Sequence, residues 1–96
     1  MLEAVDGRRG LARARLEAPD LVLTDVTMPG FNGFELAEAL RSDERTRAIP
    51  VIFVSGETSA DNHARAAELG ALAYLTKPFD PSALAAIVAG ALEART

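Results

Sequence analysis

Three residues with reactive or charged side chains each end a short hydrophobic run. Asp25, Ser55 and Lys77 are the last residues of the runs Leu21–Asp25, Val51–Ser55 and Ala73–Lys77. Short apolar runs that alternate with helical segments predict a parallel sheet with both faces covered. Ligands of such sheets bind beyond the carboxyl ends of the strands, so we expect a carboxylate, a hydroxyl and an ammonium to meet at one edge. That combination suits a phosphoryl group.

Local patterns predict helices between these runs. Leu11, Ala14 and Ala18 form a helical face that Pro19 ends. Gly33 begins a second helix.

Two further helices follow in the second half of the chain. Thr58 and Asp61 match a capping box, and Gly70 ends the helix that follows it. Asp80 is a good N-cap residue before Pro81. The last helix is amphipathic and is expected to bury Leu84, Ile87, Val88 and Leu92 against the sheet.

Residues around the three strand ends resemble the receiver domain of two-component response regulators. The resembling stretches are Asp25–Gly30 with Gly33, Val54–Gly56 and Tyr74–Phe79. The resemblance covers essentially the whole chain, in the family's order and spacing. It implies one α/β domain over residues 1–96: a flavodoxin-like doubly wound parallel sheet, N-terminally incomplete, with about four strands and four helices.

The start of the chain, Met1–Gly7, resembles the second strand of that family and the turn after it. The resemblance therefore implies that the family's first strand, first helix and metal-holding acidic pair lie upstream of Met1. Glu3 and Asp6 belong to a different strand and turn and do not match that pair. Without the strand that is central in the family, the first segment has three outcomes: pairing with the Asp25 strand, folding away from the sheet, or strand exchange in a homodimer.

The resemblance also implies roles for the residues at the strand ends. Asp25 is expected to become an aspartyl-phosphate, a known use of carboxylates in catalysis. Ser55 is expected to donate a hydrogen bond to the phosphoryl group, and Lys77 to contact it before a cis bond to Pro78. Tyr74 matches an aromatic position whose rotamer, in the family, follows the hydroxyl inward on activation.

A divalent cation is implied by the same resemblance. Asp25 and the backbone carbonyl of Thr27 are its expected ligands in this chain, and Mg²⁺ is the expected ion. Mg²⁺ prefers octahedral oxygen coordination, so its binding is expected to be weak without the acidic pair. Thr27 and Glu57 match positions that tune the rate of phosphoryl loss, whereas His63 is expected to be a solvated helix residue.

Composition narrows the possible partners and location of the protein. The chain has 96 residues, 49% of them hydrophobic, a net charge of −4 and no cysteine. The acidic balance disfavours direct nucleic-acid binding, and the arginines at 8, 9, 13 and 15 are expected to form a solvated face. No apolar stretch reaches membrane-spanning length, so no membrane contact and a cytoplasmic location are expected.

Three functions are consistent with these residues. The first is a receiver module, not an enzyme, that is phosphorylated on Asp25 by a histidine kinase or phosphotransfer protein. It would signal to a downstream protein through the surface over residues 60–69, 73–75 and 82–94. The second is a pseudo-receiver that serves as a phosphorylation-independent interaction or assembly module. The third is a metal-dependent phosphatase, which commonly needs a second acidic residue near its nucleophile, and Val26-Thr27 offers none.

Overall fold

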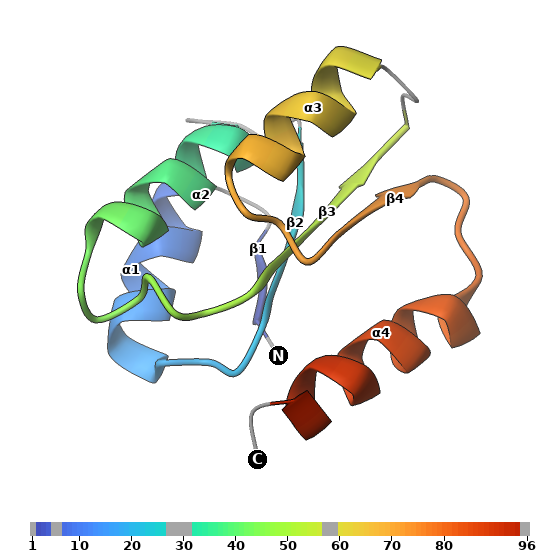
Figure 1. The fold of residues 1–96 in the computed structure, drawn as a ribbon. Helices are drawn as coiled ribbons and strands as arrows, with labels where there is room; N and C mark the ends of the chain where they lie inside the picture. Colours follow the sequence, from blue (N-terminus) through green and yellow to red (C-terminus); the bar gives the residue numbers. More distant parts are fainter. Residues whose placement is uncertain (1, 5–6, 27–31, 57–59, 95–96) are drawn as a thin grey trace.

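The computed structural model describes residues 2–4, 7–26, 32–56 and 60–94. Strands and helices alternate throughout these ranges (Figure 1). The elements are β1 (Leu2–Ala4), α1 (Gly7–Glu17), β2 (Val22–Asp25), α2 (Gly33–Ser42), β3 (Val51–Ser55), α3 (Ala60–Glu68), β4 (Ala73–Thr76) and α4 (Pro81–Ala94). The strands form one parallel sheet in the order β1-β2-β3-β4. The predicted α/β class and the four strands and four helices are confirmed.

The first segment pairs directly with β2, which is the first of the three expected outcomes. Leu2 lies opposite Val22 and Ala4 opposite Thr24 in a parallel register. The sheet therefore follows the chain order from one edge to the other.

The helices form two layers around the sheet. Helices α1, α2 and α3 lie over one face, and α4 lies on the opposite side (Figure 1). Because side chains alternate between the faces of a strand, β3 supplies Val51 and Phe53 to the first face and Ile52 and Val54 to the second. All four side chains are buried. A run that is hydrophobic at every position is thus explained by burial on both faces.

Helix α4 covers its face less completely than the sequence predicts. Leu84, Ile87 and Val88 pack on the core residues of β2 and β3, but each is only half-buried. The Leu92 side chain lies outside the described residues. Among the described helices, α4 alone packs on this side of the sheet. Its apolar residues therefore have the sheet as their packing surface.

The helix ends follow the expected chemistry with one correction. Helix α1 ends at Glu17 and not at Ala18, which is exposed and has a φ of 45°. The predicted helical face therefore extends one residue too far, because the left-handed backbone at Ala18 turns the chain toward Pro19. At the end of α3, Gly70 has a φ of 72° and closes a Schellman motif, as predicted.

The caps at helix starts are partly described. Helix α4 begins at Pro81, and Asp80 accepts hydrogen bonds from the backbone N–H and the hydroxyl of Ser82. These bonds, the backbone one first, lower the pKa of Asp80. The capping box that includes Thr58 lies outside the described residues.

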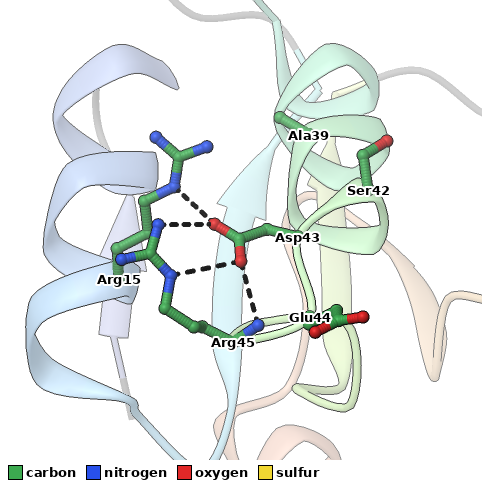
Figure 2. A pocket seen from close by; sticks show the side chains of 6 residues that line it. All are labelled: Arg15, Ala39, Ser42, Asp43, Glu44 and Arg45. Atoms are coloured by element: carbon green, nitrogen blue, oxygen red, sulfur yellow. Dashed lines mark hydrogen bonds and ion pairs between the residues drawn. The ribbon is translucent and has the colours of Figure 1, made fainter.

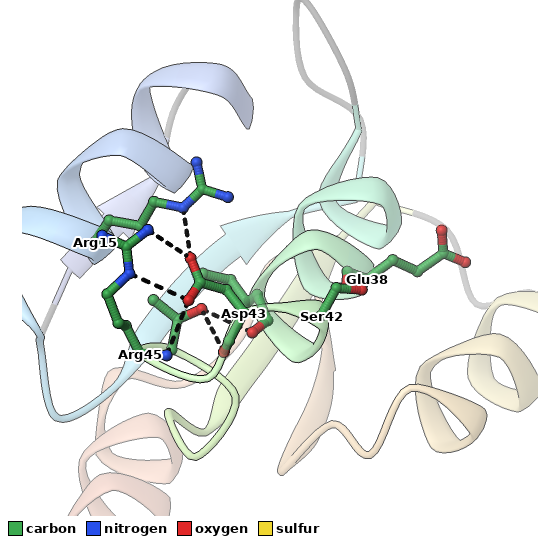
Figure 3. Close-up of polar contacts among 7 residues, drawn as sticks. Arg15, Glu38, Ser42, Asp43 and Arg45 are labelled. Carbon is green, nitrogen blue, oxygen red and sulfur yellow. Dashed lines mark hydrogen bonds and ion pairs between the residues drawn. The ribbon is translucent and has the colours of Figure 1, made fainter.

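A cluster of charged groups joins the carboxyl ends of α1 and α2. Arg15 Nε donates to Asp43 Oδ2 at 2.8 Å, and the Arg45 side chain and backbone N–H donate to the same carboxylate. Figures 2 and 3 show the two guanidinium groups converging on Asp43. Arg15, Asp43 and Arg45 also line a cleft of about 640 Å³. These donors, led by the Arg45 side chain, hold the pKa of Asp43 well below its usual range. The bond between Arg15 and Asp43 joins residues that are 28 positions apart along the chain, and so it links the ends of α1 and α2.

Candidate functional site

The three predicted site residues come to the same edge of the sheet. Asp25, at the end of β2, lies opposite Val54, and Ser55 is the next residue and the end of β3. Ser55 lies opposite Thr76, which is followed directly by Lys77. Parallel register therefore places all three residues at the carboxyl ends of adjacent strands.

Asp25 and Lys77 are in direct contact. The Lys77 Nζ atom donates to Asp25 Oδ2 at 2.5 Å, across a separation of 52 residues. The side chains remain 32% and 50% exposed for Asp25 and Lys77, respectively. A carboxylate that is paired with an ammonium and still open to solvent can be reached by a phosphoryl donor.

Backbone hydrogen bonds hold the ends of the strands in place around this pair. The Lys77 N–H donates to the Ser55 carbonyl oxygen at 2.7 Å, and the Val26 N–H donates to the Val54 carbonyl oxygen at 3.1 Å. The bond between Lys77 and Pro78 is cis, as predicted.

Helix α2 begins very close to the backbone of Asp25. A Cβ on Gly33 would lie 2.3 Å from the Asp25 carbonyl oxygen, so only glycine fits at this position. The Gly33 N–H donates to the Val26 carbonyl oxygen at 2.9 Å, and a capping box between Asn32 and Glu35 starts the helix. The sequence showed Gly33 only as part of a motif; this close contact follows from the path of α2 over β2.

Two hydroxyl side chains are buried here, that of the site residue Ser55 and that of Thr24, the neighbour of Asp25. Ser55 is 5% exposed and Thr24 is 1% exposed. The Thr24 hydroxyl donates to the Asp25 carbonyl oxygen at 3.1 Å, which helps to fix the backbone that carries the carboxylate. Sequence reasoning missed Thr24; its signal was a polar residue inside an otherwise apolar run.

The expected metal site can be tested only in part. Thr27, a predicted metal ligand, and Glu57, a predicted rate-tuning position, lie outside the described residues. Within the described part of the chain, no three His, Cys, Asp or Glu residues are grouped so that they could hold a metal ion. Of the residues at the three strand ends, Asp25 is the one with a carboxylate, and that carboxylate is paired with Lys77. These residues by themselves do not meet the octahedral oxygen coordination that Mg²⁺ prefers.

His63 is exposed, as predicted, but it also has an aromatic neighbour. Its ring lies against the Tyr74 ring, with centroids 4.2 Å apart and planes at 41°. The Asn62 side-chain amide donates to the Tyr74 hydroxyl at 3.4 Å. The sequence carried no signal for this contact, because it depends on how α3 packs beside β4.

None of the described helices is long and apolar enough to cross a membrane.

Comparison with known proteins gives a consistent result. Residues 1–89 match the response regulator receiver domain family. Among curated proteins, the chain is 44% identical over 84 residues to Protein PilH and 38% identical over 82 residues to Chemotaxis protein CheY, both of Pseudomonas aeruginosa. These alignments cover 88% and 85% of the chain and 69% and 66% of the relatives. The chain spans only 17% of Response regulator PleD of Caulobacter vibrioides.

Solved structures show the same similarity in three dimensions. Vibrio cholerae chemotaxis protein CheY4 matches with a TM-score of 0.82 and 33% identity, over 92% of this chain and 73% of that one. The signal receiver domain of a signal transduction histidine kinase from Syntrophus aciditrophicus matches with a TM-score of 0.81 and 32% identity. That alignment covers 93% of this chain and 67% of the other.

Proposed function

Because this chain belongs to the response regulator receiver domain family of two-component systems, we propose that Asp25 accepts a phosphoryl group from a histidine kinase or phosphotransfer protein. The observation that carries the proposal is the contact between Asp25 Oδ2 and Lys77 Nζ at the carboxyl edge of the sheet. A nucleophile and a fixed cation at one point are what a phosphoryl-transfer site needs.

The transfer follows from the chemistry of these groups. An Asp25 carboxylate oxygen attacks the phosphorus of a phosphohistidine, forming a P–O bond as the P–N bond breaks. The electron pair of the broken bond goes to the imidazole nitrogen, which takes a proton from solvent. Lys77 then contacts a phosphoryl oxygen in place of the carboxylate, so that its charge stays paired.

The neighbouring groups support this role for Asp25. The Thr24 hydroxyl donates to the Asp25 carbonyl oxygen and Gly33 packs closely against the same oxygen, so the backbone that carries the carboxylate is confined. Ser55 lies at the end of the intervening strand, where its hydroxyl can donate to the new phosphoryl group. Receiver domains generally bind Mg²⁺ at an acidic pocket. The described residues do not complete such a pocket here, so no step of the transfer is assigned to the metal.

Labelling with acetyl phosphate tests the proposal. The chain is incubated with acetyl phosphate and Mg²⁺, and the added phosphoryl group is measured by intact mass, with hydroxylamine release as the check for an acyl phosphate. We expect Asp25→Asn to abolish labelling and Asp61→Asn, on the exposed surface of α3, to leave it unchanged. Labelling that persists in Asp25→Asn would show that the assignment is wrong.

A second arm separates the receiver from the pseudo-receiver. The same chain is fused behind the first strand and helix of a complete receiver domain, so that an acidic pair is supplied. Labelling of the fusion that is lost in its Asp25→Asn variant would support the phosphoacceptor role, and absence of labelling in both the chain and the fusion would support the phosphorylation-independent class. One observation favours this alternative. In the described part of the chain, Asp25 is the one carboxylate at the strand ends, and it is not grouped with the further acidic residues that a metal site needs.

A further inference from the structure

Tyr74 is held from one side by the first turns of α3. The His63 ring lies against it, tilted by 41° at a centroid separation of 4.2 Å, and the Asn62 amide donates to its hydroxyl at 3.4 Å. Tyr74 is half-buried, whereas His63 is exposed. The two contacts act on different parts of the same side chain, the ring face and the hydroxyl.

Tyr74 also lies on the same face of the sheet as the Ser55 side chain. Tyr74 is opposite Phe53 in the parallel register and packs against the core under α1, α2 and α3. Ser55 comes two residues after Phe53, so strand alternation directs both side chains to this face. Tyr74 is therefore placed diagonally from Ser55, with His63 and Asn62 on its α3 side.

We propose that His63 and Asn62 are positioning residues that hold Tyr74 on the α3 side and oppose its movement toward Ser55. Helix α3 thereby sets the resting position of the Tyr74 side chain. The part of this inference that concerns phosphorylation rests on the proposed function of Asp25. The resting position itself does not depend on it.

The size of the effect follows from the kind of contact. An aromatic pair contributes about 0.5–1.5 kcal/mol beyond buried area, and an exposed partner such as His63 places this pair in the lower half of that range. We therefore expect loss of the His63 ring to shift the distribution of Tyr74 toward Ser55 by about two- to fivefold. Loss of the Asn62 amide is expected to cause a smaller shift in the same direction, because a 3.4 Å hydrogen bond is weak.

The composition of the chain makes the measurement direct. Tyr74 is the only tyrosine, so isotope-labelled tyrosine gives a single ring spin system in an NMR spectrum. The measured quantity is the ratio of the nuclear Overhauser effects from the Tyr74 ring to Ser55 Hβ and to the backbone of α3. We expect His63→Ala to raise this ratio two- to fivefold and His63→Phe, which retains a ring, to restore the parental value.

Asp61→Ala is the matched control, because Asp61 is an exposed residue in the same turn of α3. Circular dichroism checks that each variant is folded. A ratio in His63→Ala equal to that of the parent and of Asp61→Ala would overturn the proposal. So would a His63→Phe variant that behaves like His63→Ala.

Phosphorylation provides a separate arm. Asp25 labelling is measured by intact mass in the parent and in His63→Ala, and the Tyr74 ratio is measured in the same samples. We expect equal labelling and, in the labelled samples, a higher ratio in His63→Ala than in the parent. Absence of labelling in the parent counts against the proposed function alone, since the resting ratio is still measured. Equal labelling with the same ratio in both labelled proteins refutes the restraint of Tyr74 by α3 in the phosphorylated state.

Discussion

Replacement of Gly33 by alanine tests how closely α2 approaches the backbone of β2 at Asp25. The new Cβ would lie 2.3 Å from the Asp25 carbonyl oxygen, 3.1 Å from its carbonyl carbon and 3.2 Å from Val26 Cα. All three atoms belong to the backbone of the segment that carries the site. A flexible side chain cannot relieve the overlap, so the start of α2 or the end of β2 must move.

The magnitude follows from two opposing effects. Overpacking in a well-packed region costs about 1–3 kcal/mol, whereas alanine gains about 0.4–1 kcal/mol by restricting the unfolded chain. We expect a net loss of about 1–2 kcal/mol in the free energy of unfolding. For a domain of this size that loss lowers Tm by about 4–16 °C.

Gly90→Ala is the matched control. Gly90 lies in the interior of α4, and a Cβ built on it meets no described atom within 4 Å. The same substitution is therefore expected to stabilise the protein by about 0.4–1 kcal/mol, through backbone entropy and helix propensity. The opposite signs of the two variants isolate the steric effect at Gly33.

Urea unfolding followed by circular dichroism measures both variants, and acetyl phosphate labelling measures the site. We expect Gly33→Ala to lose labelling as well as stability, because the displaced backbone carries Asp25. A Gly33→Ala protein as stable as Gly90→Ala would refute the reasoning about the close approach.

Three further predictions concern the metal, the charge cluster and the exposed face of α4. The chain as printed should bind Mg²⁺ no better than Asp25→Asn in a calorimetric titration; Asp25-dependent binding at sub-millimolar metal would contradict this. Because the pKa of Asp43 is lowered in the folded state, its stabilising effect is complete above the unfolded-state pKa and is lost as pH falls below about 4. Acid unfolding of Asp43→Asn should therefore be less steep than that of the parent, and equal slopes would refute the argument. Ala86, with Ala83 and Gly90, is exposed on α4; Ala86→Arg should preserve folding and weaken partner binding or self-association, and unchanged sedimentation and pull-down results would exclude this face.

Local patterns in the sequence determined where the reactive side chains lie along the sheet. The runs ending at Asp25, Ser55 and Lys77 predicted three parallel strands, and their carboxyl ends do meet at one edge. The sequence also predicted that Gly70 ends one helix and that Asp80 is the N-cap residue of another. Each of these features depends on residues within one strand or one helical turn, so the backbone preferences of a few neighbours are enough to specify it.

Only the tertiary structure decided which distant groups touch. The sequence left three outcomes for the first segment, and the pairing of β1 with β2 depends on which strand edge is open to it. The contact of Gly33 with the Asp25 backbone and the stacking of His63 on Tyr74 depend on the paths of α2 and α3 over the sheet. Those paths are set by the packing of whole elements in the shared core, which no local residue pattern specifies.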